Sequence, residues 1–277
     1  MRVAGARRPG PGPVTGVVAG REAGEGRTAA SVAERDLWAE HDGIRVYGRL
    51  RVPDAAAPLP AVICSPFFSG DHETAGEWAA PLAEAGIVTC AIDFFGGTPH
   101  SRSGGRTTEM SVCTQAADLS AVLDVVRALP EVDPDRIYLL GQSQGGFVST
   151  IVADERPTDV AGLFLLYPAL VIHDDAVERF GAPENVPEAY EMWMELGRRY
   201  AVDALAWDPF EHMSYPGPVR IWQGDADPLV PLAYAERAAR TYASCELEVV
   251  RDAGHGFYGI RKRRITEQIV AAVLGRD

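Results

Sequence analysis

The sequence predicts an α/β protein with a mostly parallel central sheet, helices on both faces of that sheet and a small cap insertion. Short, continuous runs of apolar residues recur along the chain, as in strands that are buried on both faces. These runs alternate with amphipathic stretches that are long enough to form helices. A segment of about 45 residues, 173–217, interrupts the alternation and is rich in aromatic residues.

The first half of the chain begins with a segment that has no sustained periodicity. Residues 1–34 are rich in Gly, Ala, Pro and Arg, and we expect a disordered N-terminal extension there. The following stretch, "DLWAEHDGIRVYGRLRVP", alternates around Asp42-Gly43 and predicts a β-hairpin. Buried strands are then predicted at 60–65 and 87–94, and helices at 75–86 and 110–129. The buried face of the second helix is marked by Leu119, Val122, Leu123, Val126 and Leu129.

The second half continues the alternation around the insertion. Strands are predicted at 136–142, 160–168, 219–225 and 245–253, and helices at 145–155, 232–242 and 264–274. We therefore expect one α/β domain over residues 35–277, with the insertion at about 173–217 lying over the C-terminal edge of the sheet, where such folds bind ligands. Within the insertion, one helical face is expected to carry Tyr190, Trp193, Met194 and Gly197.

Composition excludes several classes of function. The formal net charge of the 277 residues is −13, and the one short basic run, 261–264, is expected to start the last helix, so we expect no nucleic acid partner. No apolar run reaches the length of a membrane span, and the first residues lack the apolar core of a secretory signal, so we expect a cytoplasmic protein. Four scattered cysteines fit free thiols.

The stretch "LLGQSQGGFVS" places a serine among glycines where a predicted strand gives way to a predicted helix. Gly141 and Gly145 lie two residues on either side of Ser143, and Gly146 follows. A turn this sharp strains the residue at its tip and requires small neighbours. It also holds the serine hydroxyl above the sheet edge, at the positive end of a helix. The G-x-S-x-G pattern in this context predicts that Ser143 is a nucleophile.

A neutral serine needs a base that takes its proton. Three histidines follow Ser143 in the chain. Of these, His255 lies in the Gly-flanked loop "RDAGHGF" after the last predicted strand, from where it could reach the sheet edge, and it is the predicted base. His173 and His212 lie in the insertion and at its exit, where surface or packing roles suit them better.

The base in turn needs a carboxylate that orients it. The loop "IWQGDADPLVP" follows the penultimate predicted strand and offers Asp225 and Asp227. We prefer Asp227, which lies further into the loop. Asp225 would then stabilise the turn by bonding its own backbone.

With these residues in place, the chain resembles the α/β hydrolases, and among them small carboxylesterases of the feruloyl and cinnamoyl type, which are S33-like hydrolases. The resemblance covers roughly residues 36–277 and is carried by "IDFFGGTPHSRSGG", "TTEMSVCTQAADLSAVLDVV", "GQSQGGFVS", "GLFLLYPAL", "GDADPLVP" and "DAGHGF". It implies a serine carboxylesterase with the triad Ser143, Asp227 and His255, an acyl-enzyme intermediate, and no cofactor or metal.

The resemblance also implies an oxyanion hole, with one departure. Such enzymes usually carry His-Gly-X after the first buried parallel strand, and this chain has "CSPFFSG", with Pro66-Phe67 in the His-Gly place. Phe68 is then X, and the backbone N–H groups of Phe68 and Gln144 would bind the oxyanion. Phe67 is the alternative donor. Each donor is typically worth about 10²–10³ in rate, so a misplaced loop would weaken activity without abolishing it.

The substrate is the least readable part of the sequence. We expect a small-molecule ester, in a pocket lined by Phe67, Tyr167, Trp193 and Phe257. The aromatic residues of the insertion fit either the core of a small cap or an acyl or aryl pocket. A peptidase, amidase or thioesterase could use the same triad, and a non-catalytic binding module that kept the fold is a further alternative. A homo-oligomer is compatible with the sequence.

Overall fold

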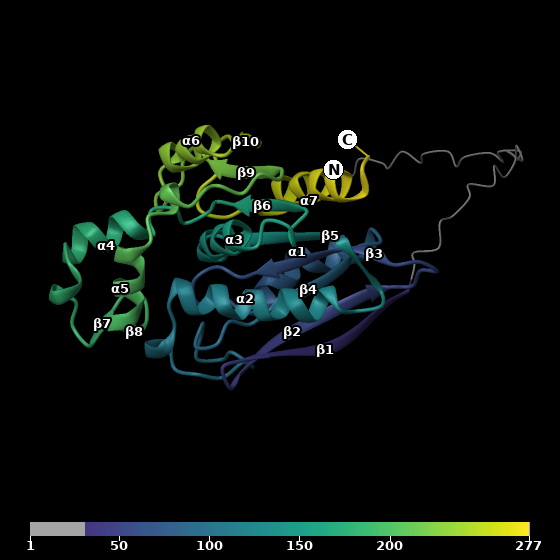
Figure 1. The fold of residues 1–277 in the computed structure, drawn as a ribbon. Coiled ribbons are helices and arrows are strands. Elements are labelled where there is room, and N and C mark those ends of the chain that lie inside the picture. Colours follow the sequence, from purple (N-terminus) through teal and green to yellow (C-terminus); the bar gives the residue numbers. More distant parts are fainter. Residues whose placement is uncertain (1–30, 277) are drawn as a thin grey trace, which may run out of the picture.

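The computed structural model describes residues 31–276, and these begin with the predicted hairpin (Figure 1). Strands β1 (Val32–His41) and β2 (Ile44–Pro53) pair antiparallel, with His41 opposite Ile44. Asp42 and Gly43 form the turn with φ values of 47° and 78°. Tight two-residue hairpin turns need positive φ, which Asp-Gly tolerates. Most of the expected extension, residues 1–30, lies outside the described residues, and β1 begins three positions before the expected domain start at residue 35.

The hairpin joins an eight-stranded sheet whose order is β1-β2-β4-β3-β5-β6-β9-β10. From β4 onward, every neighbouring pair in this order is parallel, which confirms the predicted fold class. The parallel strands are β3 (Leu59–Ser65), β4 (Val88–Ile92), β5 (Val132–Gln142), β6 (Gly162–Leu166), β9 (Val219–Gly224) and β10 (Cys245–Val250). The chain order reverses at β3, between β4 on one side and β5 on the other, and open α/β sheets bind ligands at such a switch point.

Helices cover both faces of the sheet, as predicted (Figure 1). One face packs against α2 (Val112–Arg127), α3 (Gln144–Glu155) and α6 (Leu232–Thr241). The other packs against α1 (His72–Glu84) and α7 (Gly259–Leu274). The last helix begins earlier than expected, so the basic run 261–264 lies inside its first turns. Among the described residues, no helix combines the length and the apolarity that a membrane crossing requires.

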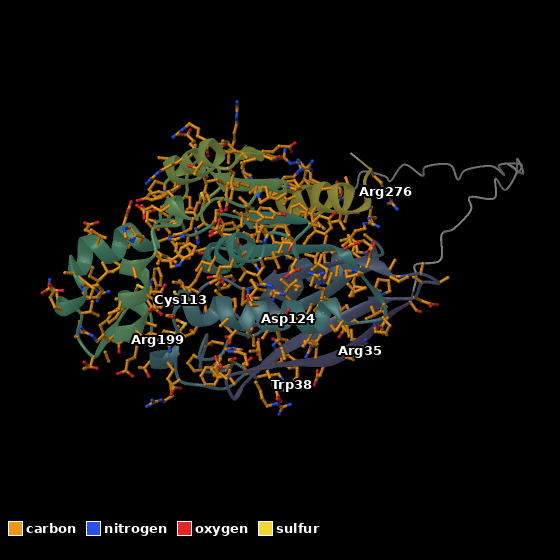
Figure 2. All side chains as sticks on the ribbon, in the orientation of Figure 1. Arg35, Trp38, Cys113, Asp124, Arg199 and Arg276 are labelled. Carbon is orange, nitrogen blue, oxygen red and sulfur yellow. The ribbon has the colours of Figure 1, made fainter. Side chains whose placement is uncertain are left out.

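The chain between β6 and β9 forms a cap beyond one end of the sheet, at the left of Figure 1. It contains α4 (Ile172–Phe180), a small hairpin of β7 (Ala189–Glu191) and β8 (Glu195–Gly197), and α5 (Arg198–Ala206). The N-terminal part of α2 contacts α5, and Figure 2 shows Cys113 of α2 near Arg199 of α5. The cap therefore rests on the end of a core helix.

The prediction that Tyr190, Trp193, Met194 and Gly197 share one face of a helix is wrong. Residues 189–197 form the hairpin, in which Tyr190 lies opposite Leu196 and Trp193 occupies the turn with a φ of 59°. Contacts from distant residues hold this shape. The Thr107 hydroxyl donates a 2.6 Å hydrogen bond to the Glu195 carbonyl, and the backbone at Gly197 lies against that of Thr108 in the same short turn, Thr107–Glu109. Helical spacing of four residues is too weak a signal to oppose such tertiary contacts.

Candidate active site

Ser143 lies at the tip of a strained turn between β5 and α3. Its φ of 49° and ψ of −114° lie outside the ordinary regions for an L-residue. The flanking glycines make this turn fit. A Cβ at Gly141 would lie 2.3 Å from the Gly145 carbonyl oxygen, and a Cβ at Gly145 would lie 2.4 Å from that of Pro66. The close approach predicted from the glycine pattern is therefore present, and it also brings the loop after β3 against the start of α3.

The structure brings Ser143, His255 and Asp227 together in one hydrogen-bonded chain. The His255 Nε2 lies 2.8 Å from the Ser143 Oγ, and the His255 Nδ1 lies 2.8 Å from Asp227 Oδ2. An ionised carboxylate only accepts hydrogen bonds, so the imidazole carries its proton on Nδ1. The Nε2 lone pair then faces the serine hydroxyl, which is the arrangement that a general base requires.

Asp227 is held in its ionised form. Its side chain is 0% exposed, and Oδ1 accepts from the backbone N–H groups of Leu229 (2.9 Å) and Val230 (3.0 Å). The Gln223 amide donates to Oδ2 over 2.9 Å. Burial by itself would raise the pKa of Asp227, but the hydrogen bonds from His255 and the two backbone N–H groups outweigh it, and the pKa is lowered.

The other acid considered, Asp225, stays outside this chain. It is exposed and accepts a 2.7 Å hydrogen bond from the backbone N–H of Asp252. Asp225 therefore ties its loop to the residues just after β10, whereas the sequence predicted that it would bond its own backbone. The other two histidines are also remote from Ser143 in their contacts. His173 is hydrogen-bonded to the Ala204 carbonyl, and His212 stacks on a tryptophan of the cap exit.

The loop after β3 and the first residue of α3 supply the candidate oxyanion donors. Phe68 and Gln144 both line the cavity that contains Ser143. The N–H of Gln144 belongs to the first turn of α3, where no partner within the helix is available. Within residues 31–276, the Phe68 N–H donates to no protein group. The loop is closed by a 2.9 Å hydrogen bond from the Gly70 N–H to the Phe67 carbonyl.

A cavity of about 650 Å³ opens above Ser143 and His255, between the sheet edge and the cap. Three of the expected lining residues, Phe67, Tyr167 and Trp193, border it. The fourth expectation is wrong, because Phe257 is buried behind Tyr167, at a ring distance of 5.2 Å. Tyr167 itself packs edge-on against His255 at 4.9 Å, so Phe257 supports the wall without forming it.

The cavity has further aromatic walls. Tyr190 and Tyr200 belong to the aromatic residues of the insertion, for which the sequence left a core role and a pocket role open, and both line the cavity. Phe180 and Tyr258 also line it and were missed by the sequence analysis. The cap helix α4 adds two ionisable groups, Asp175 and Arg179. Burial, together with the neighbouring acids Glu178 and Asp174, raises the pKa of Asp175. The many aromatic residues of the insertion were the only sequence feature that indicated an aromatic pocket. That feature does not identify which rings face the cavity.

Comparisons with known proteins agree with this architecture. The family model described as "Serine aminopeptidase, S33" matches residues 67–204, a span that includes Ser143. An uncharacterized protein of Mycobacterium tuberculosis is 30% identical over 234 residues, which is 82% of this chain and 75% of the relative. The sequence similarity therefore extends well beyond the nucleophile turn.

Solved structures give the same result. Est1E from Butyrivibrio proteoclasticus, in a structure with bound ferulic acid, is 25% identical, has a TM-score of 0.78, and matches over 87% of this chain and 98% of its own. Acetyl xylan esterase 1 from Thermoanaerobacterium is 18% identical with a TM-score of 0.66, covers 88% of each chain, and shows the shared fold. Together with the family match, these results establish that the chain is a serine-type α/β hydrolase of the S33 family.

Proposed function

We propose that this hydrolase is a carboxylesterase that works through an acyl-enzyme. The observation that carries the proposal is the unbroken hydrogen-bond chain from Ser143 through His255 to Asp227, placed at the floor of an aromatic cavity. A serine, a neutral imidazole and a buried carboxylate in this order form a nucleophile, its base and the group that orients the base.

In the first step, Nε2 of His255 takes the hydroxyl proton while Ser143 Oγ attacks the ester carbonyl carbon. The carbonyl π electrons move to the oxygen, and a tetrahedral oxyanion forms. The N–H groups of Phe68 and Gln144 are the proposed donors to this oxyanion, since both residues border the cavity at Ser143. Asp227 stabilises the imidazolium without taking its proton.

In the second step, the imidazolium of His255 gives its proton to the leaving alcohol oxygen as the bond from carbon to that oxygen breaks. An acyl group remains on Ser143. Water then repeats the sequence: His255 takes a proton from water, the hydroxide attacks the acyl carbon, and Ser143 Oγ leaves with the proton. Atoms and charge balance without any redox partner.

The cavity favours an acyl or aryl group of moderate size. Its volume of about 650 Å³ and its many aromatic walls suit a flat, largely apolar group. Est1E has been solved with ferulic acid bound, so a hydroxycinnamate ester is the first substrate class that we would test on this chain.

The test is hydrolysis of p-nitrophenyl acetate, butyrate and octanoate and of methyl ferulate by the wild-type protein and by Ser143→Ala. We expect turnover by the wild type that disappears in the variant, together with fluorophosphonate labelling of the wild type alone. Ser244→Ala is the matched control. That exposed serine lies just before β10, whereas His255 lies in the loop after β10, at the other end of the strand. Folded wild type that hydrolyses no ester would exclude the carboxylesterase proposal.

The description of the family model points to the second candidate function. That description names an aminopeptidase, and an amide can be attacked by the same triad. Amino-acid p-nitroanilides and an acyl thioester therefore belong in the same assay. Labelling of Ser143 without ester turnover would favour these substrates, and the absence of any labelling would favour a binding protein.

A further inference from the structure

A tyrosine of the cap contacts the residue that follows the candidate nucleophile. Tyr200 lies in α5, and its hydroxyl donates a 2.6 Å hydrogen bond to the side-chain oxygen of Gln144. The side-chain nitrogen of Gln144 donates a 2.8 Å bond to the amide oxygen of Gln115 in α2. Gln115 in turn contacts Met110 Sδ at 3.2 Å. The two ends of the Gln144 amide are therefore held by two different regions, the cap and the core.

These side chains are almost fully removed from solvent. Tyr200 is 5% exposed, and Gln144 and Gln115 are each 2% exposed. Burial raises the pKa of Tyr200 far above its usual range, so the hydroxyl remains a donor at any physiological pH. A buried amide oxygen that loses its protein donor loses the hydrogen bond that fixes its direction, and the side chain is then free to take another arrangement.

The strained backbone at Gln144 is restrained from two sides. Ser143, whose φ is 49°, precedes it, and the Ser143 carbonyl of the shared peptide group accepts hydrogen bonds from the N–H groups of Gly146 (2.9 Å), Phe147 (3.1 Å) and Ala169 (2.9 Å). The Gln144 side chain adds a further restraint. Strained conformations persist only where the surroundings over-determine them. A Gln144 side chain that is held at both ends restrains the peptide group between residues 143 and 144, which carries the proposed oxyanion donor.

We propose that Tyr200 is a positioning residue. Its hydroxyl, carried by the cap, fixes the Gln144 side chain and thereby the direction of the Gln144 N–H toward the oxyanion. This inference rests on the proposed esterase function. It gives the cap a part in the chemical step, in addition to its part in the wall of the cavity.

The first test is Tyr200→Phe, which removes the hydroxyl and keeps the ring in the cavity wall. We expect kcat for p-nitrophenyl butyrate to fall about tenfold, a fraction of the loss that follows removal of a whole oxyanion donor. KM should stay within about twofold, because the wall is unchanged. Affinity for an aryl boronic acid, whose serine adduct places an oxygen at the oxyanion position, should fall in proportion to kcat.

Tyr215→Phe is the matched control. The hydroxyl of Tyr215 is also buried and donates a 2.8 Å hydrogen bond, to the carbonyl of Val160. Tyr215 does not line the active-site cavity. Its loss should lower the Tm and leave kcat unchanged, which separates loss of a buried hydrogen bond from loss of positioning.

A double-mutant cycle tests whether Tyr200 acts through Gln144. Gln144→Met keeps the length of the side chain and removes both hydrogen-bonding atoms. We expect Tyr200→Phe to cost no further activity in that background. Should Tyr200→Phe misfold, Gln115→Leu releases the other end of the Gln144 amide and should lower kcat in the same way.

The inference is overturned if Tyr200→Phe keeps the wild-type kcat, raises KM alone, or costs the same in both backgrounds. Tyr200 would then be only a wall of the cavity. Failure of the esterase proposal looks different, because the wild type itself would then hydrolyse no ester and resist the fluorophosphonate.

Discussion

The sheet end and the cap face each other across the same cavity, but they are built differently. Strands β3, β4 and β6 are buried along almost their whole length, and α3 buries a continuous run from its first residue. In the cap, Ala176 is the only buried residue of α4, and each hairpin strand has three residues. Segments with few buried contacts adapt and open more easily than a packed core does. We therefore expect the sheet end to carry most of the chemistry and the cap mainly to select the substrate, with the hydrogen bond from Tyr200 to Gln144 as the point where the cap also serves the chemical step.

The largest effect should come from the sheet end. Asp227→Asn replaces the acceptor of the Nδ1 proton by an amide, which favours the wrong tautomer of His255. We expect kcat to fall about 10⁴-fold. The neighbouring Asp225→Asn should change kcat little, because Asp225 accepts a hydrogen bond from the backbone N–H of Asp252 and makes no contact with His255. Steady-state kinetics on both variants checks the assignment, which equal losses would contradict.

The next largest effect should come from the close approach of Gly145 to the carbonyl oxygen of Pro66. Gly145→Ala would place a Cβ 2.4 Å from the carbonyl oxygen of Pro66, so the loop that carries Phe68 must move away from α3. We expect a loss of about 10² in kcat, comparable to that of one oxyanion donor. Gly76→Ala, in helix α1, is the control, since its nearest neighbour is a flexible arginine end 3.6 Å away. That change should leave activity intact and stabilise the helix by up to about 1 kcal/mol.

A change in the cap should affect selection more than chemistry. Trp193 is 76% exposed at the cavity rim. The centroid of its ring lies 5.5 Å from that of the Phe68 ring, in an edge-to-face arrangement. Trp193→Ala should raise KM for methyl ferulate several-fold and leave kcat/KM for p-nitrophenyl acetate nearly unchanged. The free energy of unfolding should shift by less than about 0.5 kcal/mol, as at other exposed sites. An equal loss of kcat/KM for both esters would contradict this prediction, because Trp193 would then affect the reaction and not only the choice of substrate.

The smallest effect concerns pH and stability. The pKa of Asp227 is lower in the folded protein than the ordinary value of 3.8 for an aspartate, because the hydrogen bonds from His255 and two backbone N–H groups outweigh its burial. The associated stabilisation is therefore present above pH 3.8 and is lost as pH falls through the folded-state pKa. Urea unfolding of the wild type and of Asp227→Asn should give a difference in stability that narrows from pH 7 to pH 3. If this difference in stability widened as the pH fell, the pKa of Asp227 would have to be raised by folding, which would contradict the assignment.

The sequence is most informative where local patterns determine structure. Apolar runs predicted the parallel strands, Asp42-Gly43 predicted the hairpin, and the glycines around Ser143 predicted a strained turn, because each rests on backbone geometry within a few residues. The hairpin at residues 189–197 was missed because Thr107 and its neighbours, far away in the chain, hold it. The contact of Tyr200 with Gln144 joins residues 56 positions apart, and no local pattern contains it.

The exposed indole of Trp193 has an optical consequence. Trp78 and Trp222 are buried in the same core cluster and should emit at short wavelength, and Trp38 and Trp207 are half-buried, whereas Trp193 is 76% exposed at the mouth of the cavity. Trp193, as the most exposed of the five indoles, should therefore contribute most at the red edge of the emission spectrum. A ligand that enters the cavity should quench or blue-shift that edge alone, so the protein carries its own titration signal and needs no attached dye.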